Sequence, residues 1–356
     1  MDVCSYYRSY GVYIYDTILL MNKNKSIVIW LLSGCTLIFI MVVVGGITRL
    51  TDSGLSMVKW NLFMGTIPPL NEIEWKETFN LYKAYPEYQK INFNCTLSEF
   101  KSIFFWEYLH RMIGRLLGVV FLIPFIYFLI KRRLSKKLII QTSILLCMGT
   151  LQGAIGWWMV KSGLVDNPDV SHYRLAVHLI TAFITFAYTF WVALPLIFTK
   201  ERKENTTLKK YTNILIIGII IQIIYGGFVA GLNAGIGFNT WPKMNGEWIP
   251  EAVYQLEPLW ENFVEAPYGI QFIHRTLAII IVLFIVYIWR KSKDFSLNSN
   301  QIKSLNTLFI LIILQTLLGI FTLIYEVPIS LAALHQIGAF FLLSAAVYSK
   351  FIFSKS

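Results

Sequence analysis

Charged residues are scarce in this sequence. Only 14% of its 356 residues are Asp, Glu, Lys or Arg, whereas 56% are hydrophobic and the mean hydropathy is +0.58. This balance excludes a water-soluble domain of this size, because such a domain needs more charge on its surface. A lipid bilayer is the expected solvent, and the 16% of aromatic residues fits belts at two membrane interfaces.

Cysteine is scarce as well. The four cysteines are predicted to lie on an inner tail, on two membrane spans and in one outer loop: Cys4, Cys35, Cys147 and Cys95. No two of them share the oxidising side of a membrane, so the sequence predicts no disulfide framework.

Long apolar runs are what the sequence has in place of charge. A helix needs roughly 20 apolar residues to span a bilayer, and eight runs are long enough. They lie at roughly 26–48, 104–130, 138–160, 173–199, 211–234, 269–289, 304–325 and 331–353. The predicted fold is an all-α polytopic membrane protein with eight transmembrane helices.

Basic residues alternate with these runs. They follow the second, fourth and sixth runs in three clusters: Lys131, Arg132, Arg133, Lys136 and Lys137; Lys200, Arg202, Lys203, Lys209 and Lys210; Arg290, Lys291, Lys293 and Lys303. The positive-inside rule places these loops and both termini in the cytoplasm. The net charge of +11 therefore indicates topology, not nucleic-acid binding. Two long loops, at roughly 49–103 and 235–268, are expected to cap a site on the opposite side.

Residues 1–25 form the predicted cytoplasmic N-terminal segment. Met1 to Leu20 have little positive charge and no cleavage-site pattern, so they match neither a signal peptide nor a transit peptide. Met21, followed by Asn22-Lys23-Asn24-Lys25, is an ordinary lead into a first span, and we expect it to be the true start. The absence of an Arg-rich leader favours a bacterial inner membrane over a mitochondrial one.

The sequence contains an internal repeat. The matching segments are 45–46 with 226–227, 107–111 with 271–275, and 151–156 with 314–319. Because four spans return a chain to its starting side, this is a parallel repeat of two four-helix bundles. We predict an N-terminal half at 26–199, a basic cytoplasmic linker at 200–210 and a C-terminal half at 211–353.

Four of the five histidines occupy repeated positions inside the spans, two in each half: His110, His178, His274 and His335. Polar side chains at lipid depth are costly and normally face the bundle interior. Neutral imidazole is the usual protein ligand of haem iron, and two imidazoles from facing helices would hold a macrocycle between them. The sequence therefore predicts two haem sites, each within about two turns of the outer end of its spans.

Other interpretations of these histidines are weaker. A zinc site is disfavoured, because each half lacks the thiolates or carboxylates that would complete a tetrahedron. The fifth histidine, His172, has no partner in the repeat and is expected at the surface. Arg111, Arg174 and Arg275 lie beside the repeated histidines. Their guanidinium groups are predicted to pair with haem propionates, or alternatively to reach the outer interface.

One difference between the halves is informative. Glu107 precedes His110 by three residues and shares its helix face, whereas Gln271 stands before His274. A desolvated carboxylate there is available for proton abstraction or for stabilising a developing cation. The alternative is an interfacial glutamate that caps the start of the helix. The difference predicts chemistry in the first half and a permanent redox cofactor in the second.

Several motifs together resemble the heme A synthase family over about residues 30–345. In the first half they are Gly45-Gly46-Ile47-Thr48-Arg49-Leu50-Thr51, Trp60, Gly65, Pro68-Pro69, Tyr85-Pro86-Glu87-Tyr88 and Glu107-Tyr108-Leu109-His110-Arg111. In the second half they are Asn239-Thr240-Trp241-Pro242, Trp248-Ile249-Pro250 and Gln271-Phe272-Ile273-His274-Arg275. One branch of the family carries a cysteine pair in an outer loop. This chain has only Cys95 there and resembles the branch without the pair.

The resemblance implies a membrane oxidoreductase that oxidises the C8 methyl group of haem O to the formyl group of haem A for terminal oxidase assembly. It implies haem b as cofactor between His274 and His335, and haem O as substrate near His110 and His178, with Glu107 catalytic. Two successive hydroxylations, with oxygen from water, would give a geminal diol that loses water. The implied partners are haem O synthase, terminal oxidase assembly factors and membrane lipid, and a homo-oligomer is left open.

Two other classes of protein are weaker alternatives. A non-catalytic dihaem b-type electron-transfer subunit would also use four helical histidines, but it needs no carboxylate beside only one haem, as Glu107 would be. A transporter is disfavoured, because no span is broken by paired Gly and Pro in its outer half. The glycine pairs at 45–46 and 226–227 are better explained by close helix packing.

Overall fold

The computed structural model describes residues 3–57, 67–165, 168–198 and 202–355, with side chains from residue 24 onward. Three residues singled out from the sequence lie outside these ranges: Trp60, Gly65 and Lys200. The side chains of Met1 to Leu20 lie outside them as well.

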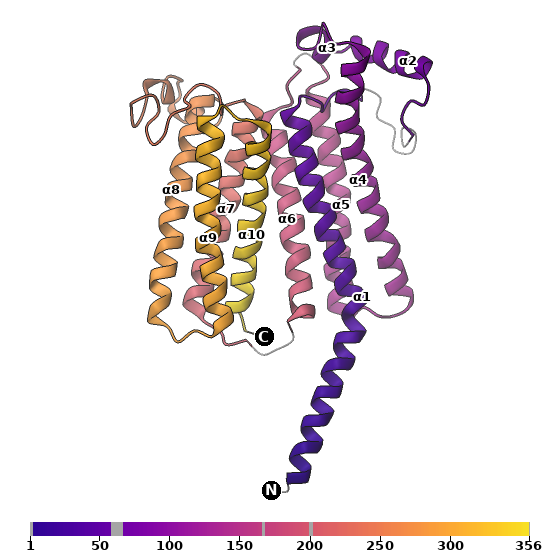
Figure 1. Cartoon of the computed structure of the whole chain (residues 1–356), viewed down its shortest axis with the longest axis vertical. Helices are drawn as coiled ribbons and strands as arrows, with labels where there is room; N and C mark the ends of the chain where they lie inside the picture. Colours follow the sequence, from indigo (N-terminus) through magenta and orange to yellow (C-terminus); the bar gives the residue numbers. More distant parts are fainter. Residues whose placement is uncertain (1–2, 58–66, 166–167, 199–201, 356) are drawn as a thin grey trace.

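Eight long helices make up the body of the protein (Figure 1). They are α1 (Val3–Leu50), α4 (Leu97–Ile130), α5 (Lys136–Ser162), α6 (His172–Ile197), α7 (Thr206–Gly231), α8 (Pro267–Lys291), α9 (Ser299–Ile324) and α10 (Ile329–Phe353). Each contains a stretch long and apolar enough to cross a membrane; in α1 it is Asn24–Leu50. Because the described residues contain no β-strand, the all-α prediction is confirmed.

The helices pack as two equivalent groups. In the first group α1 lies against α4 and α6, and α5 lies against α6; in the second, α7 lies against α8 and α10, and α9 lies against α10. The groups meet where α6 contacts α7 and α10 and where α1 contacts α10 (Figure 1). Two copies of one four-helix unit in the same orientation give this pattern, as the repeat predicts.

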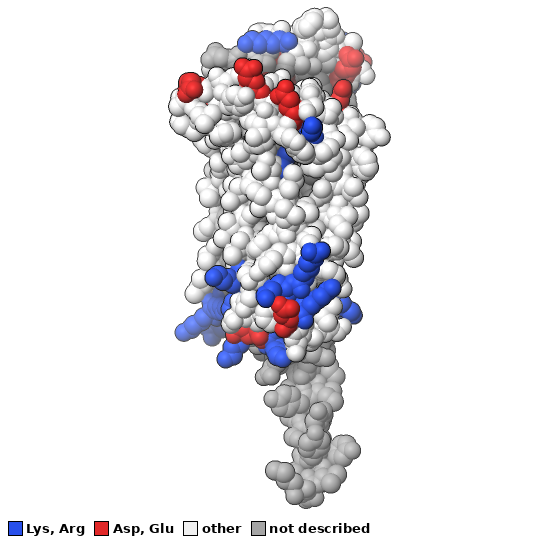
Figure 2. All heavy atoms as spheres, turned by 90° about the vertical axis from the view of Figure 1, so that its left-hand side faces the viewer, with Lys and Arg blue, Asp and Glu red and all other residues white. Residues whose placement is uncertain are grey.

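Charge is distributed unequally along the bundle. Lys and Arg gather around one end of the helices, while Asp and Glu are more frequent at the other (Figure 2). Both chain termini lie at the basic end (Figure 1). A multi-pass membrane protein that obeys the positive-inside rule has this asymmetry.

The first outer loop contains helices that the sequence analysis did not predict. They are α2 (Glu72–Lys83) and α3 (Pro86–Lys90), and α4 itself begins at Leu97 rather than at 104. A capping box between Thr96 and Glu99 fixes this start. The added turns of α4 carry Phe100, whose ring stacks on Phe79 and lies close to Tyr82 of α2. The second outer loop has only the short 3₁₀ turns η1 (Glu251–Val253) and η2 (Leu259–Phe263).

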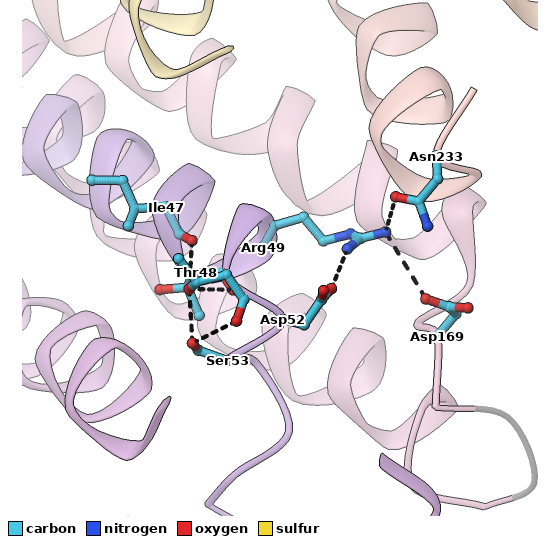
Figure 3. A network of polar contacts seen from close by, with 8 residues as sticks. Ile47, Thr48, Arg49, Asp52, Ser53, Asp169 and Asn233 are labelled. Atoms are coloured by element: carbon cyan, nitrogen blue, oxygen red, sulfur yellow. Dashed lines mark hydrogen bonds and ion pairs between the residues drawn. The ribbon is translucent and has the colours of Figure 1, made fainter. Parts of the chain in front are cut away.

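Arg49, in the last turn of α1, joins the two halves at the end of the bundle opposite the chain termini (Figures 1 and 3). Its Nη1 lies 2.9 Å from Asp52, while its Nη2 donates to Asn233 after α7 at 3.0 Å and lies 3.9 Å from Asp169. Asp52 and Asn233 both have positive φ, 45° and 50°, in the turns that follow the equivalent helices α1 and α7. Equivalent turns of the two repeats are therefore tied together by one guanidinium.

Candidate functional site

In the first half, each repeated histidine rests against a glycine of the preceding long helix, which is α1 for α4 and α5 for α6. A Cβ added to Gly45 on α1 would lie 2.9 Å from Cε1 of His110 on α4. A Cβ added to Gly156 on α5 would lie 2.9 Å from Cε1 of His178 on α6. Each glycine therefore provides room that any larger residue would take from an imidazole.

The second half repeats this arrangement. His274 on α8 rests against Gly226 on α7, and His335 on α10 rests against Gly319 on α9, with distances from an added Cβ to Cε1 of 3.4 and 2.8 Å. The centroids of the two imidazole rings are 6.5 Å apart, with an angle of 75° between the ring planes. All four repeated histidines are partly buried. The structure therefore brings the predicted pair of this half together from facing helices.

The second glycine of each pair packs between the halves. A Cβ at Gly46 would overlap the side chain of Gln336 on α10, and a Cβ at Gly227 would lie 3.0 Å from Cα of Ala176 on α6. Close helix packing thus explains only one glycine of each pair. The other glycine makes room for a histidine.

Three glutamines that were not predicted from the sequence contact the histidines: Gln152 at His178, Gln222 at His274 and Gln315 at His335. The signal was present, because Gln152 and Gln315 fall in the repeat. Each of the three stands four residues before the glycine that faces the same histidine.

Glu107 on α4 is 3% exposed and holds residues 56 and 57 of the first outer loop against that helix. Its carboxylate accepts hydrogen bonds from the Ser56 hydroxyl and the Met57 N–H, both at 2.7 Å, and from Nη2 of Arg111 at 2.5 Å. The alternative that Glu107 caps the start of its helix is wrong, because α4 begins at Leu97. Glu107 therefore lies well inside the helix, one turn outward from His110.

Two of the predicted propionate partners bind protein groups. Arg111 donates to Glu107 and to the carbonyl oxygen of Met57. Arg174 donates to the carbonyl oxygen of Trp158 at 2.8 Å, and its guanidinium group lies 4.6 Å from the centroid of the Trp158 side-chain ring. Their pairing with propionates stays a prediction.

Arg275 has a donor to spare. Its Nη2 donates to the carbonyl oxygens of Thr240 and Pro242 at 2.8 and 3.1 Å, and its guanidinium lies 5.2 Å from the ring centroid of Trp241. Its Nη1 is buried and has no hydrogen-bond partner among the described residues. Such a donor one residue from His274 suits an anionic group bound at this site.

His172 is not at the surface, so its predicted location is wrong. It is 9% exposed, and its Nε2 contacts the carbonyl oxygen of Val264 at 2.9 Å. Its ring packs edge-on against Phe228 of α7. His172 therefore joins the start of α6 to the second outer loop, a contact between the two halves that the repeat could not indicate.

The residues present fit haem better than a bare metal ion. The described residues contain no group of three or more His, Cys, Asp or Glu side chains that could hold a metal ion. Haem supplies four nitrogen ligands itself and needs only axial imidazoles, and the orphaned Nη1 of Arg275 suits a propionate. Fold and site together define a polytopic helical membrane protein with a candidate two-histidine haem site in each half.

Comparison with known proteins identifies the family. Residues 28–347 match the family described as cytochrome oxidase assembly protein, and the chain belongs to that family. A heme A synthase of Flavobacterium johnsoniae is 52% identical over 340 residues, covering 94% of this chain and 99% of the relative. A heme A synthase of Flavobacterium psychrophilum is 53% identical over 339 residues, covering 94% and 100%. One of Nitrosospira multiformis is 45% identical over 329 residues, covering 91% and 92%.

Proposed function

We propose that the protein is a heme A synthase, an oxidoreductase that converts the C8 methyl group of haem O into the formyl group of haem A for terminal oxidase assembly. Relatives of that name are similar over more than nine-tenths of the chain. The single observation that carries the proposal is the duplicated histidine pair with a carboxylate, Glu107, in the first half only.

The reaction sets requirements for the site. Conversion of a methyl group to a formyl group removes four electrons and four protons and takes one oxygen atom, assigned here to water. Haem b, when bound, supplies a one-electron redox centre beside the substrate half. His274 and His335 would hold it, with Arg275 beside a propionate. The electron acceptor lies outside the chain.

The first half is proposed to bind haem O through His110 and His178. Glu107 shares the helix face of His110, so its carboxylate borders the outward side of this site. We assign it as the group that accepts a proton from the reacting carbon or from the attacking water. Ser56, Met57 and Arg111 hold the carboxylate in one orientation, which keeps this base at a fixed position relative to the bound substrate.

The first outer loop is proposed to keep bulk water from this site. Ser56 and Met57 connect the end of α1 to Glu107, while α2 packs on the outward extension of α4. A cover of this kind limits side reactions of a partly oxidised substrate.

The deciding experiment is haem extraction and chromatography from cells that express this chain together with a haem O producer. The expected result is haem A, which cells with the haem O producer alone do not form. Accumulated haem O without haem A, while the full-length chain is present in the membrane, would contradict the proposal and favour a dihaem electron carrier.

We further propose a bacterial inner membrane with both termini in the cytoplasm, and haem O synthase and oxidase assembly factors as partners. The basic end of the bundle supports this orientation. A reporter that is active only in the cytoplasm, fused after Ser356, is expected to be active. An inactive but intact fusion would reverse the orientation.

A further inference from the structure

Each candidate axial histidine faces two residues of the preceding long helix, and these occupy equivalent positions in all four cases. These are the glycine against its ring and the residue four positions earlier, one helical turn away. The four pairs read Met41 and Gly45, Gln152 and Gly156, Gln222 and Gly226, and Gln315 and Gly319. Three of the four histidines therefore have a glutamine beside them, and His110 has a methionine.

The three glutamines share two contacts, and Gln222 makes a third, because its amide nitrogen also lies 3.3 Å from Nε2 of His274. In every pair the amide nitrogen lies 3.2 Å from Nδ1 of the imidazole. It also donates to the backbone carbonyl oxygen of the same histidine, at 2.8 Å from Gln152, 3.0 Å from Gln222 and 2.9 Å from Gln315. Each glutamine therefore restrains both the ring and the backbone of its histidine.

His110 lacks such a partner. Among the described residues no side chain bonds its buried Nδ1, and the backbone of Met41 lies beside the ring just as the backbones of Gln222 and Gln315 lie beside His274 and His335. The side chain of Met41, on α1, points toward Gly114 of α4, and its Cε would lie 3.4 Å from a Cβ added to that glycine. A thioether is at best a weak acceptor, so it cannot replace the amide.

The acceptor oxygens of the glutamines also differ between the halves. Oε1 of Gln152 accepts a hydrogen bond from the Thr181 hydroxyl. The register of α10 puts Gly338 where α6 has Thr181, three residues after the histidine, and Oε1 of Gln315 lies against it without a partner. Oε1 of Gln222 is likewise buried and unpartnered. Within the described residues, the glutamines beside the histidines of the second half therefore have two unused acceptor oxygens, whereas the acceptor oxygen of Gln152 in the first half is used.

Those acceptors matter because of how imidazole binds iron. A histidine that binds iron through Nε2 carries its proton on Nδ1, and an acceptor there fixes the ring and strengthens the ligand. Rotating the glutamine amide by half a turn about its Cγ–Cδ bond exchanges the positions of its oxygen and nitrogen, and so brings Oε1 to Nδ1. In all three pairs this turn ends the hydrogen bond from the amide nitrogen to the histidine carbonyl oxygen, and in the first half Gln152 would also have to give up the hydrogen bond from Thr181.

We propose that these glutamines set how firmly each half holds its haem. Gln222 and Gln315 are positioning residues that retain a permanent haem in the second half. Met41 and the Gln152–Thr181 bond leave the first half with weaker axial ligands, which suits a haem that must enter as substrate and leave as product. The identities of the two haems rest on the proposed function, but the difference in retention does not.

The test exchanges equivalent residues between the halves. The full chain is purified with haem, and the transfer of haem to excess apomyoglobin is followed together with the low-spin electron paramagnetic resonance signal. Gln222→Met is expected to release the haem of the second half about 10- to 100-fold faster and to shift its signal. Gln222→Glu, which keeps an oxygen acceptor, is expected to restore slow release.

Met41→Gln is the opposite change. It is expected to slow the release of haem from the first half by a similar factor. If the Gln222 variant does not accumulate, this second variant decides. Wild-type release rates in both variants would overturn the inference even if haem A is formed, whereas faster release from Gln222→Met without any haem A would contradict only the proposed function.

Discussion

The two halves of the molecule share a scaffold and differ at a few positions around their histidines. Both present two imidazoles from facing helices against glycines of the preceding helices. They differ where the first half has Glu107 and Met41 and the second has Gln271 and Gln222. The two halves therefore differ in the residues around the histidines and not in the helices that carry them.

The carboxylate at 107 is the sharpest difference, and its removal should have the largest effect. Glu107→Ala is expected to lower the conversion of haem O by at least about 100-fold, the usual contribution of a positioned general base, while haem b stays bound. Haem A yield in membranes is the measurement, and the b-type spectrum reports retention of the cofactor.

The matched control changes the equivalent residue of the second half. Gln271 is 2% exposed, and within the part of the chain that the structure describes its side chain makes one long hydrogen bond, 3.4 Å, to the carbonyl oxygen of Phe238. Gln271→Ala is expected to leave conversion within about threefold of wild type, since it supplies no base. Equal losses in the two variants would show that the halves do not differ in the way proposed.

The glycines at the histidines give a second, smaller contrast. Gly45→Ala should displace His110, because the new methyl group would lie only 2.9 Å from Cε1, whereas the corresponding distance at Gly226 is 3.4 Å. Overpacking of this kind costs about 1–3 kcal/mol, so we expect conversion to fall about tenfold in Gly45→Ala. Gly226→Ala should retain haem b. Haem titration of both variants is the check, and loss of haem b from Gly226→Ala alone would reverse the expected order.

The first outer loop contains a buried carboxyl group. Glu87 on α3 is 3% exposed, and burial raises the pKa of its carboxyl group to about 8. The negative charges of Glu107, Asp52 and Asp169 raise that pKa further, while a hydrogen bond with Tyr82 opposes the shift. The folded cap therefore retains a proton that an unfolded glutamate would release.

This shift in the pKa of Glu87 predicts that the thermal stability of the first outer loop depends on pH. Folding raises the pKa of the Glu87 carboxyl group. The contribution of this group to the free energy of unfolding is therefore complete below about pH 4.5 and is lost as the pH rises through about 8. The wild-type protein should melt at a lower temperature at pH 9 than at pH 6, and Glu87→Gln should reduce that difference. Tryptophan fluorescence during heating measures it. An unchanged difference in the variant would assign the pH dependence to other groups.

The sequence was sufficient for the parts of the structure that depend on periodic patterns. Apolar run length gave the eight spans, and the repeat gave the grouping of helices and the four histidine positions. The start of α4 was misplaced, because Glu99 and Lys101 interrupt the apolar run. The helix nevertheless extends through them, since Thr96 caps it and Phe100 packs on α2.

Contacts between distant segments could not be predicted in the same way. Glu107 is held by Ser56 and Met57, some fifty residues earlier, and no local pattern indicates that pairing. His172 is buried by a contact with Val264, 92 residues away in sequence. The glutamines were recoverable, because the spacing Gln-x-x-x-Gly recurs three times, but its meaning depends on knowing which helix faces each histidine.

The central claim is that one histidine pair in each half coordinates haem and that the second pair retains haem b. The most direct test is the absorption spectrum of the purified protein and of its His335→Ala and His178→Ala variants. We predict a low-spin b-type spectrum that His335→Ala abolishes and His178→Ala keeps. A wild-type protein without Soret absorption despite adequate porphyrin supply, or full retention of the b-type spectrum in His335→Ala, would contradict the account.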